Sequence, residues 1–249
     1  MEKRRKFQGA LNILSFNRHF YYAGIAILSM WITGYIFIGW APLLFWIITI
    51  AFLYGLFVPL FVSAYVYDYS GYYSLNWLKN FVSETDNARL VVNIHAGFDE
   101  TSFLIKDKFQ SANLRVFDFY NAEKHTEPAI VRARKVSLTY PDTEIIMSNK
   151  IPLADNSADI IFLLSAVHEI RSNDEKVIFL KECHRVCKPT GKIIMTEHLR
   201  DFPNFLAFSV GFTHFFSRNT WKKAFSRAGF TQFNEKKFTP FMSIFQSSR

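Results

Sequence analysis

The stretch that decides the fold is RLVVNIHAGFDETSFLI, residues 89–105. Its first half is apolar enough to form a buried strand of a parallel sheet, and its second half predicts a helix after a tight turn. Such turns usually carry three spaced glycines, which let backbone N–H groups approach a bound cofactor. Here the three positions are His95, Gly97 and Asp99, so one glycine remains.

The chain beyond this stretch alternates strands and helices. Apolar runs predict further strands at 113–118, 143–148, 157–166 and 192–197, helices at 100–109, 126–136, 173–188 and 217–229, and a final hairpin over 230–246. Asn173 or Asp174 is expected to cap the third helix, and Pro189 with Gly191 to end it. Right-handed crossovers then predict an α/β fold with a doubly wound, mostly parallel sheet and a C-terminal antiparallel hairpin.

The N-terminal part is uncharged over a long run. No Asp, Glu, Lys or Arg occurs between residues 20 and 67. Because about 20 residues cross the hydrocarbon core, this run suits two spans, which we predict at 21–38 and 43–65. The alternative is a buried helical hairpin in a soluble core, which the lack of a polar face disfavours. A cleavable signal peptide fits poorly, since the apolar region is too long.

The charge distribution predicts the orientation of this hairpin. The residues ahead of the first span include the basic side chains Lys3, Arg4, Arg5, Lys6 and Arg18. Because positive flanks stay cytoplasmic, we expect the domain after the two spans to be cytoplasmic, at a bacterial inner membrane. The net charge of +8 favours anionic head groups as a partner, and no basic-aromatic module for nucleic acid is present. The sequence does not indicate an oligomeric state.

These features divide the chain into four parts. They are a basic cytoplasmic N-terminus (1–19), two transmembrane helices (20–67), an interfacial connector (68–86) and an α/β domain (87–249). Within the domain, Cys183 and Cys187 lie on one predicted helix with His184 between them. A zinc site needs more ligands than this segment supplies, so we expect no metal there. A reduced cysteine pair agrees with a reducing cytoplasm.

The order of several motifs resembles one enzyme family, the class I (Rossmann-like) S-adenosylmethionine-dependent methyltransferases. The motifs are VVNIHAGFDE (91–100), VFDFYN (116–121), IPLADNSADIIFLLSAVHEI (151–170), LKECHRVCKPTGKIIMTEH (180–198) and W...F..AGF (221–230). They cover roughly two thirds of the chain, from Arg89 onward. The resemblance implies that residues 87–249 are a methyltransferase domain and that its cofactor is S-adenosylmethionine.

The resemblance also implies which residues hold the cofactor. Asp118, at the end of the second strand, would accept hydrogen bonds from both ribose hydroxyls. Gly97 would let the backbone approach the methionine part of the cofactor. Asn93 stands where the family usually has an acidic residue, so it brings no charge to the ammonium group. The other positions assigned to this site are His95, Asp99, Phe119, Ser148, Asn149 and Ser165, with Ser148 and Asn149 nearest the adenine.

Two of these positions depart from the family pattern. Asp99 replaces a glycine, and we expect it to keep the turn because Asp tolerates left-handed backbone; it could also supply the missing negative charge. His95 replaces another glycine. Either its side chain points away from the cofactor, or it weakens or reshapes the binding of the cofactor.

The ends of the fourth and fifth predicted strands carry the candidate catalytic residues. Ligands of open α/β sheets gather at the carboxyl ends of the strands, which brings His168, Glu197 and His198 toward the transferred methyl group. Methyl transfer depends mainly on alignment, and a base is needed only if the acceptor loses a proton. We expect His168, and after it His198, to be that base, with Glu197 orienting a partner.

A phenylalanine-rich insertion, residues 199–221, follows the fifth strand. It predicts a lid over an apolar pocket, an amphipathic element dipping into a bilayer, or plain core. Beside two spans, it favours a hydrophobic acceptor: a lipid, a quinone-like compound or an aryl compound. Two rival functions stay open: a non-catalytic membrane adaptor with a degenerate fold, and a nicotinamide-dependent oxidoreductase, which the missing glycine fingerprint disfavours.

Overall fold

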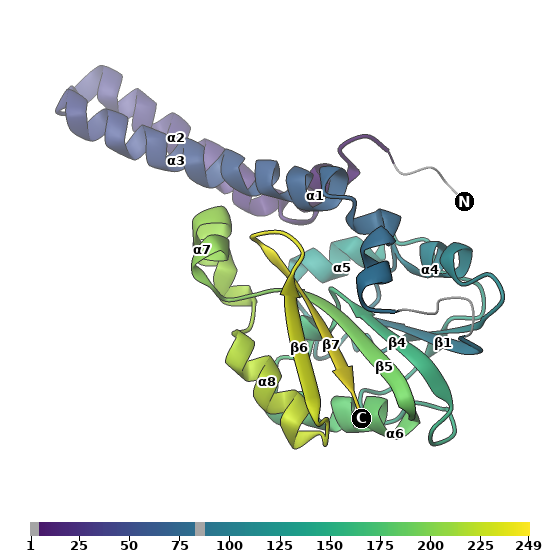
Figure 1. Ribbon diagram of the computed structural model, residues 1–249. Helices are drawn as coiled ribbons and strands as arrows, with labels where there is room; N and C mark the ends of the chain where they lie inside the picture. Colours follow the sequence, from purple (N-terminus) through teal and green to yellow (C-terminus); the bar gives the residue numbers. More distant parts are fainter. Residues whose placement is uncertain (1–4, 83–87) are drawn as a thin grey trace.

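A computed structural model describes residues 5–82 and 88–249 of the chain. The C-terminal part is built on one seven-stranded sheet in the order β3-β2-β1-β4-β5-β7-β6 (Figure 1). The strands are β1 (Leu90–His95), β2 (Asn113–Asp118), β3 (Glu144–Ile145), β4 (Ala158–Leu164), β5 (Cys187–His198), β6 (Gln232–Lys237) and β7 (Met242–Ser248). The first five run parallel, and β7 runs antiparallel to β5 and β6. This confirms the predicted sheet.

Both faces of the sheet are buried, as the apolar sequence of its central strand predicts. Successive side chains of a strand point to opposite faces. In β4, Ile161 and Leu163 therefore pack with α6 (Asn173–Val186) and α8 (Arg218–Arg227). Ile160 and Phe162 belong to a second apolar cluster on the other face, which includes α4 (Ser102–Lys108).

The segment after the N-terminal helices covers part of this second face. Residues 75–82, expected as one short helix, contain the 3₁₀ helix Asn76–Asn80, which follows a first 3₁₀ helix, Tyr72–Ser74. Leu75 and Leu78 are buried in the same cluster as β4. Residues assigned to an interfacial connector thus contribute to the core of the domain. The boundary expected between residues 86 and 87 lies outside the described residues, as do Lys3 and Arg4.

The ends of α6 differ from the prediction. Ser172, which has extended backbone, caps the helix by accepting a hydrogen bond from the N–H of Glu175. Asn173 and Asp174 are already helical and are not the cap. β5 begins directly after the helix, so Pro189 and Gly191 lie inside the strand rather than ending the helix.

Two long apolar helices, α2 (Arg18–Ile38) and α3 (Pro42–Ser63), form a hairpin that projects from the domain (Figure 1). By length and composition each could cross a membrane, and almost none of their apolar surface is buried. The helical prediction for both segments is confirmed. α3 continues without a break into a π-helix, Ala64–Tyr69, which leads to the domain.

A helix that the sequence did not predict, α1 (Gln8–Phe16), joins the hairpin to the domain. Two N–H groups in the first turn of α1 donate hydrogen bonds to the carboxylate of Asp68, and the bond from Gly9 is 2.8 Å long. A Cβ at Gly9 would lie 2.4 Å from Cβ of Tyr67, so only glycine allows this close approach. At the other end, Arg132 of α5 (Pro128–Arg134) donates to the last carbonyl of α1 at 2.5 Å.

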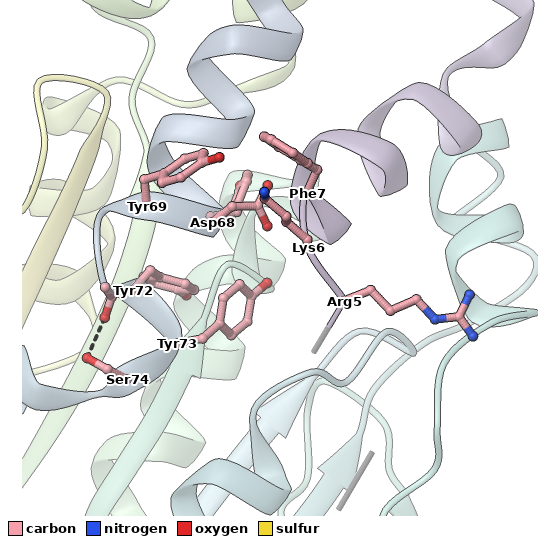
Figure 2. A pocket seen from close by; sticks show the side chains of 10 residues that line it. Arg5, Lys6, Phe7, Asp68, Tyr69, Tyr72, Tyr73 and Ser74 are labelled. Atoms are coloured by element: carbon pink, nitrogen blue, oxygen red, sulfur yellow. Dashed lines mark hydrogen bonds between the residues drawn. The ribbon is translucent and has the colours of Figure 1, made fainter. Parts of the chain in front are cut away.

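A cavity of about 380 Å³ lies where the start of α1 meets the residues that follow α3. Basic and aromatic side chains line it, and Figure 2 shows Lys6 and Asp68 turned toward one another while Arg5 points away. Neither Gly97 nor Asp118 belongs to this cavity. It is therefore a feature of the junction between hairpin and domain, separate from the predicted cofactor site.

The phenylalanine-rich insertion forms α7 (Phe202–Phe208) and a 3₁₀ segment, Ser209–His214. α7 lies beside the hairpin (Figure 1), and the hydroxyl of Tyr54, midway along α3, donates to the carbonyl of Leu206 at 2.6 Å. The outward side of this insertion is apolar, with Phe202 strongly exposed. Much of it is therefore not the plain core that was one of the predicted alternatives.

Candidate active site

Gly97 and Asp99 stabilise the turn after β1 in two different ways. Gly97 has a φ of +86°, in the left-handed region that favours glycine. Asp99 was expected to adopt left-handed backbone, but it does not. Instead its Oδ1 accepts hydrogen bonds of 2.9 Å from the N–H groups of Thr101 and Ser102, at the start of α4. The third glycine of the family pattern is thus replaced by Asp99, whose side chain holds the turn.

The ring of His95 folds back into its own loop. Its Nδ1 accepts a 3.0 Å hydrogen bond from the N–H of Gly97, and its Nε2 lies 4.0 Å from Oδ2 of Asp99. Nδ1 also lies 3.9 Å from Oδ1 of Asp118, the residue paired with His95 in the β1–β2 register. The imidazole therefore lies beside Asp118, and the space in front of Gly97 is taken by another residue.

That residue is Arg134, at the end of α5. A Cβ added to Gly97 would lie 2.0 Å from Nη1 of Arg134, so the guanidinium occupies the open side of the glycine. Nη1 also donates to Oδ2 of Asp118 at 2.7 Å, and the guanidinium carbon lies 4.0 Å from the ring centre of Tyr120. The Asp118 carboxylate is 7% exposed and points toward this space, not toward bulk solvent.

Three buried polar atoms around this loop have no hydrogen-bond partner in the described part of the chain. They are Oδ1 of Asn93, Nε2 of His95 and Oδ2 of Asp99. Leaving such an atom unsatisfied costs about 1–3 kcal/mol, so three of them in one loop indicate a missing polar partner. A ligand with an ammonium group would satisfy the two oxygens, and the Asp118 carboxylate suits a diol. The residues present therefore fit an adenosyl amino-acid cofactor once Arg134 turns outward.

The remaining residues assigned to the cofactor lie in several environments. Phe119 packs into the core against Phe179. The hydroxyl of Ser148 donates to Glu175 of α6 at 2.6 Å, and Asn149 follows in the same partly exposed turn. Ser165 has a φ of +52° and ends β4. Their roles toward an adenine or methionine group stay predictions.

The ends of β4 and β5 bring together a second group of polar side chains. Nδ1 of His168 lies 2.7 Å from Oε2 of Glu197, and its Nε2 lies 3.5 Å from Oε1 of Glu169. The imidazole of His214 packs edge-on against that of His168, with 5.0 Å between ring centres. Nδ1 of His214 in turn lies 3.0 Å from Oε2 of Glu127. We call these five residues the polar cluster.

The electrostatics of this cluster bear on the base predicted from the sequence. Burial alone would lower the pKa of His168, but the carboxylates of Glu197 and Glu169 raise it to about 10. In this arrangement both ring nitrogens are protonated at neutral pH, so His168 cannot take a proton from an acceptor until one of them leaves. Oε2 of Glu197 lies 2.7 Å from Nδ1 of His168, and the orienting role of Glu197 stays a prediction.

His198, the second candidate base, is held on both sides. Its Nδ1 donates to the carbonyl of Phe241 at 2.8 Å, and its Nε2 accepts from the hydroxyl of Tyr67 at 2.8 Å. Burial lowers the pKa of His198 to about 4, so the ring is neutral under ordinary conditions. Nδ1 therefore links the end of β5 to the residue before β7, and Nε2 links it to the π-helix that follows α3.

This environment makes a prediction for stability against pH. The folded pKa of His198, about 4, lies below its usual 6.5, so its contribution is fully present above pH 6.5 and is lost as pH falls through 4. The shift corresponds to a contribution of about 3 kcal/mol. Thermal unfolding of the full chain in detergent should show wild type losing stability across that window relative to His198→Gln. A difference between the two that does not change with pH would contradict the assignment.

Comparisons with known proteins show similarity to methyltransferases. A family described as a methyltransferase domain matches residues 120–195. Human N-acetylserotonin methyltransferase, solved with S-adenosylmethionine, is similar over 77% of this chain and 55% of its own, with 17% identity and a TM-score of 0.52. A S-adenosylmethionine-dependent methyltransferase from Aquifex aeolicus is similar over 71% of this chain and 92% of its own, with 17% identity and a TM-score of 0.50.

This chain has the fold of the class I methyltransferases. A S-adenosylmethionine-dependent methyltransferase from Mesorhizobium loti, 14% identical with a TM-score of 0.50, covers 72% of this chain and is itself covered over 99%. The chain thus spans a little over half of the human methyltransferase but nearly all of some bacterial ones. No curated protein matches the sequence. Neither rival function, adaptor or nicotinamide-dependent oxidoreductase, gains support from these likenesses to methyltransferases.

The methyltransferase fold places the loop after β1 and the polar cluster at the same edge of the sheet, where the parallel strands end. Sequence reasoning missed four residues of this edge: Arg134, Tyr120, His214 and Glu127. Tyr120 directly follows the assigned pair Asp118–Phe119 and could have been found by its position. Arg134 and His214 lie far along the chain from their partners, and no spacing rule connects them.

Proposed function

We propose that the protein is a membrane-anchored S-adenosylmethionine-dependent methyltransferase that acts on a hydrophobic acceptor. The observation that carries the proposal is that Gly97, the buried Asp118 carboxylate and three unpartnered polar atoms lie around one place, which the Arg134 guanidinium fills, at the edge where the parallel strands end. The cofactor supplies an electrophilic methyl group on sulfur. The chain would align this methyl group with the acceptor, and alignment supplies most of the acceleration in a direct displacement.

Each part of the cofactor has a partner in this assignment. Asp118 would accept hydrogen bonds from the ribose hydroxyls of the cofactor. These bonds would replace the one that Arg134 donates to Asp118 when no cofactor is bound. Gly97 gives the methionine part room along the backbone. The amide oxygen of Asn93 and the free carboxylate oxygen of Asp99 meet the ammonium group, so Asp99 supplies the charge that Asn93 lacks.

The apolar surface of the two N-terminal helices α2 and α3 supports membrane anchoring by two spans. α2 and α3 expose their apolar side chains along their whole length, which water would not stabilise. Arg5, Lys6 and Arg18 lie on the domain side of the hairpin, and positive flanks favour the cytoplasm. The domain would then lie in the cytoplasm against anionic head groups of a bacterial inner membrane.

The position of α7 supports an acceptor that is dissolved in the bilayer. Because α7 contacts α3 near its midpoint, the phenylalanine-rich face lies along the membrane hairpin, not at its cytoplasmic end. His198, behind this insertion, stacks on Phe215 with 5.0 Å between ring centres. A lipid, quinone-like or aryl acceptor would pass beneath α7 to reach the strand ends without crossing water.

Methyl transfer into lipid tests this function. The full chain in nanodiscs of bacterial lipids is incubated with methyl-labelled S-adenosylmethionine, and the organic extract is counted and analysed by mass spectrometry. We expect label in an apolar product with wild type and none with Asp118→Ala. Absence of label from lipid extracts, quinones and phenolic compounds alike, with intact folded protein, would contradict the proposal.

Arg134 makes a separate prediction for cofactor affinity. Because its guanidinium occupies the space in front of Gly97 and binds Asp118, the cofactor must displace it. The ion pair between Arg134 and Asp118, in which the arginine side chain is 34% exposed, contributes about 1 kcal/mol. Because the cofactor need not break this pair in Arg134→Ala, that variant should bind S-adenosylhomocysteine about fivefold more tightly. Isothermal titration measures this, with Arg132→Ala on the same helix as the matched control. A loss of affinity in Arg134→Ala would show that the guanidinium binds the ligand.

The apolar face of α7 makes a prediction for turnover. In the double variant Phe202→Asp/Phe205→Asp, each carboxylate placed against lipid costs on the order of 1–3 kcal/mol. Methyl transfer to a bilayer-dissolved acceptor should therefore fall by at least about tenfold, while the Kd for S-adenosylhomocysteine stays unchanged. Ile178→Asp, a similarly exposed apolar position on α6, is the control. Wild-type turnover in the double variant would argue against acceptor entry beneath α7.

A further inference from the structure

Part of the polar cluster has the composition of a metal site. One ring nitrogen each of His168 and His214 and a carboxylate oxygen of Glu169 lie within 4.8 Å of one another. His168 and Glu169 are adjacent residues that follow β4, and His214 ends the 3₁₀ segment after α7. Two separate elements therefore supply the ligands. None of these residues belongs to the space around Gly97 and Asp118.

The outer contacts of the two imidazoles are an independent sign of metal binding. Nδ1 of His168 lies 2.7 Å from Glu197, whose side chain is 1% exposed, and Nδ1 of His214 lies 3.0 Å from Glu127. A histidine that binds a metal through one nitrogen almost always donates its other N–H to a carboxylate, a carbonyl or water, which fixes the ring. Both rings here carry that carboxylate partner, so each Nε2 remains for an ion.

We propose that His168, Glu169 and His214 bind one divalent first-row transition ion, with Glu197 and Glu127 orienting the two imidazoles. Two imidazoles and one carboxylate are a ligand set of catalytic zinc sites, which leave a further position open. Tetrahedral ligands around zinc lie about 3.4 Å apart, so binding requires the three groups to draw together by about 1 Å. His214, in a short 3₁₀ segment with a side chain 27% exposed, has the freedom to make that movement.

Charge and access favour a cation at this place. The carboxylates of Glu127, Glu169 and Glu197 surround the two imidazoles, so a bound cation would lie against negative charge. His168 and Glu169 are partly accessible at the strand ends, which gives the ion a route of entry. Cys183, on α6, and Cys187, the first residue of β5, are buried free cysteines and are not among the proposed ligands.

The open position of the ion gives the site a role, and this role rests on the proposed function. An acceptor hydroxyl bound to a divalent ion loses its proton near neutral pH, because the ion stabilises the alkoxide or phenolate. The proton passes to solvent or to a carboxylate of the cluster, and the oxygen then attacks the methyl group while sulfur leaves as a thioether. The site would thus select acceptors that carry an oxygen.

The test measures metal binding without cofactor or acceptor, so its failure and a failure of the proposed function are distinguishable. The full chain is purified in detergent without a polyhistidine tag, stripped with a chelator and titrated with Zn²⁺ by calorimetry; Co²⁺ is followed by its visible absorption. His214→Ala and Glu169→Gln remove ligands, and Glu127→Gln removes an orienting group. His184→Ala, near the opposite end of the sheet, is the control.

We expect one Zn²⁺ per chain in wild type and in His184→Ala. His214→Ala and Glu169→Gln should each weaken binding by at least about tenfold, and Glu127→Gln by about 10–100-fold. The Co²⁺ spectrum of wild type should show ligand-field bands that are lost in His214→Ala, which is independent of any change in stability of the variants. Absence of Zn²⁺ and Co²⁺ binding in wild type, or binding unchanged in the double variant His214→Ala/Glu169→Gln, would overturn the proposal.

Discussion

Replacing Asp118 with alanine is expected to abolish measurable binding of S-adenosylhomocysteine to the full chain. The carboxylate is buried at the end of β2 and would accept a hydrogen bond from each ribose hydroxyl. Hydrogen bonds to a charged group contribute about 1.5–3 kcal/mol each. Losing two of them corresponds to a weakening of at least about 100-fold, which isothermal titration would record as the disappearance of heat.

Two further variants separate binding from folding. Asp118→Ala also frees Arg134 from its ion pair, so the double variant Asp118→Ala/Arg134→Ala should bind as poorly as the single one. Asp174→Ala removes an exposed carboxylate of α6 and should bind like wild type. If Asp118→Ala, folded by circular dichroism, binds within threefold of wild type, the carboxylate does not hold the cofactor.

The second large effect is expected at His168. His168→Ala should lower the rate of methyl transfer by about 10²- to 10⁴-fold while leaving the Kd for S-adenosylhomocysteine within about threefold of wild type. The imidazole lies in the polar cluster at the strand ends, away from the cofactor contacts around Gly97 and Asp118, so its loss affects reaction and not cofactor binding. Single-turnover transfer with preloaded cofactor measures the rate without the binding step.

Matched variants define this role of His168. Glu197→Gln keeps the shape of the buried side chain but removes the charge beside Nδ1, so the rate should fall less than in His168→Ala. His184→Ala, outside the cluster, should react like wild type. Turnover in His168→Ala within threefold of wild type would remove His168 from the chemistry, whether it acts on a proton or holds an ion.

The sheet could be predicted from sequence because its strands are buried on both faces and alternate with amphipathic helices. Residues Ile160 to Leu163 are all apolar, which predicts a strand covered on both faces of the sheet. The right-handed crossover rule then leaves few topologies. The cap of α6 was misplaced by one or two residues, because Ser172, Asn173 and Asp174 all suit a cap and only the backbone conformation decides among them. α1 was missed because its stability comes from contacts with the hairpin and α5, not from its own sequence pattern.

The candidate site was predictable only in part. Gly97 and Asp118 follow from a local rule, since each ends or follows a strand at the expected spacing. Asp99 kept the turn by capping α4 rather than by left-handed backbone, a distinction that the sequence does not contain. Arg134 reaches the loop from a helix outside the motif, so its occupation of the cofactor space is a tertiary contact that no residue pattern records.

The central claim is that the space in front of Gly97 belongs to an adenosyl cofactor and that Arg134 fills it only in the cofactor's absence. The most direct measurement is an experimental structure of the full chain in nanodiscs with S-adenosylhomocysteine. We expect ligand density across Gly97, ribose hydroxyls on the Asp118 carboxylate and the guanidinium of Arg134 withdrawn. A saturated sample in which Arg134 still binds Asp118 and the ligand is absent or bound elsewhere would contradict it.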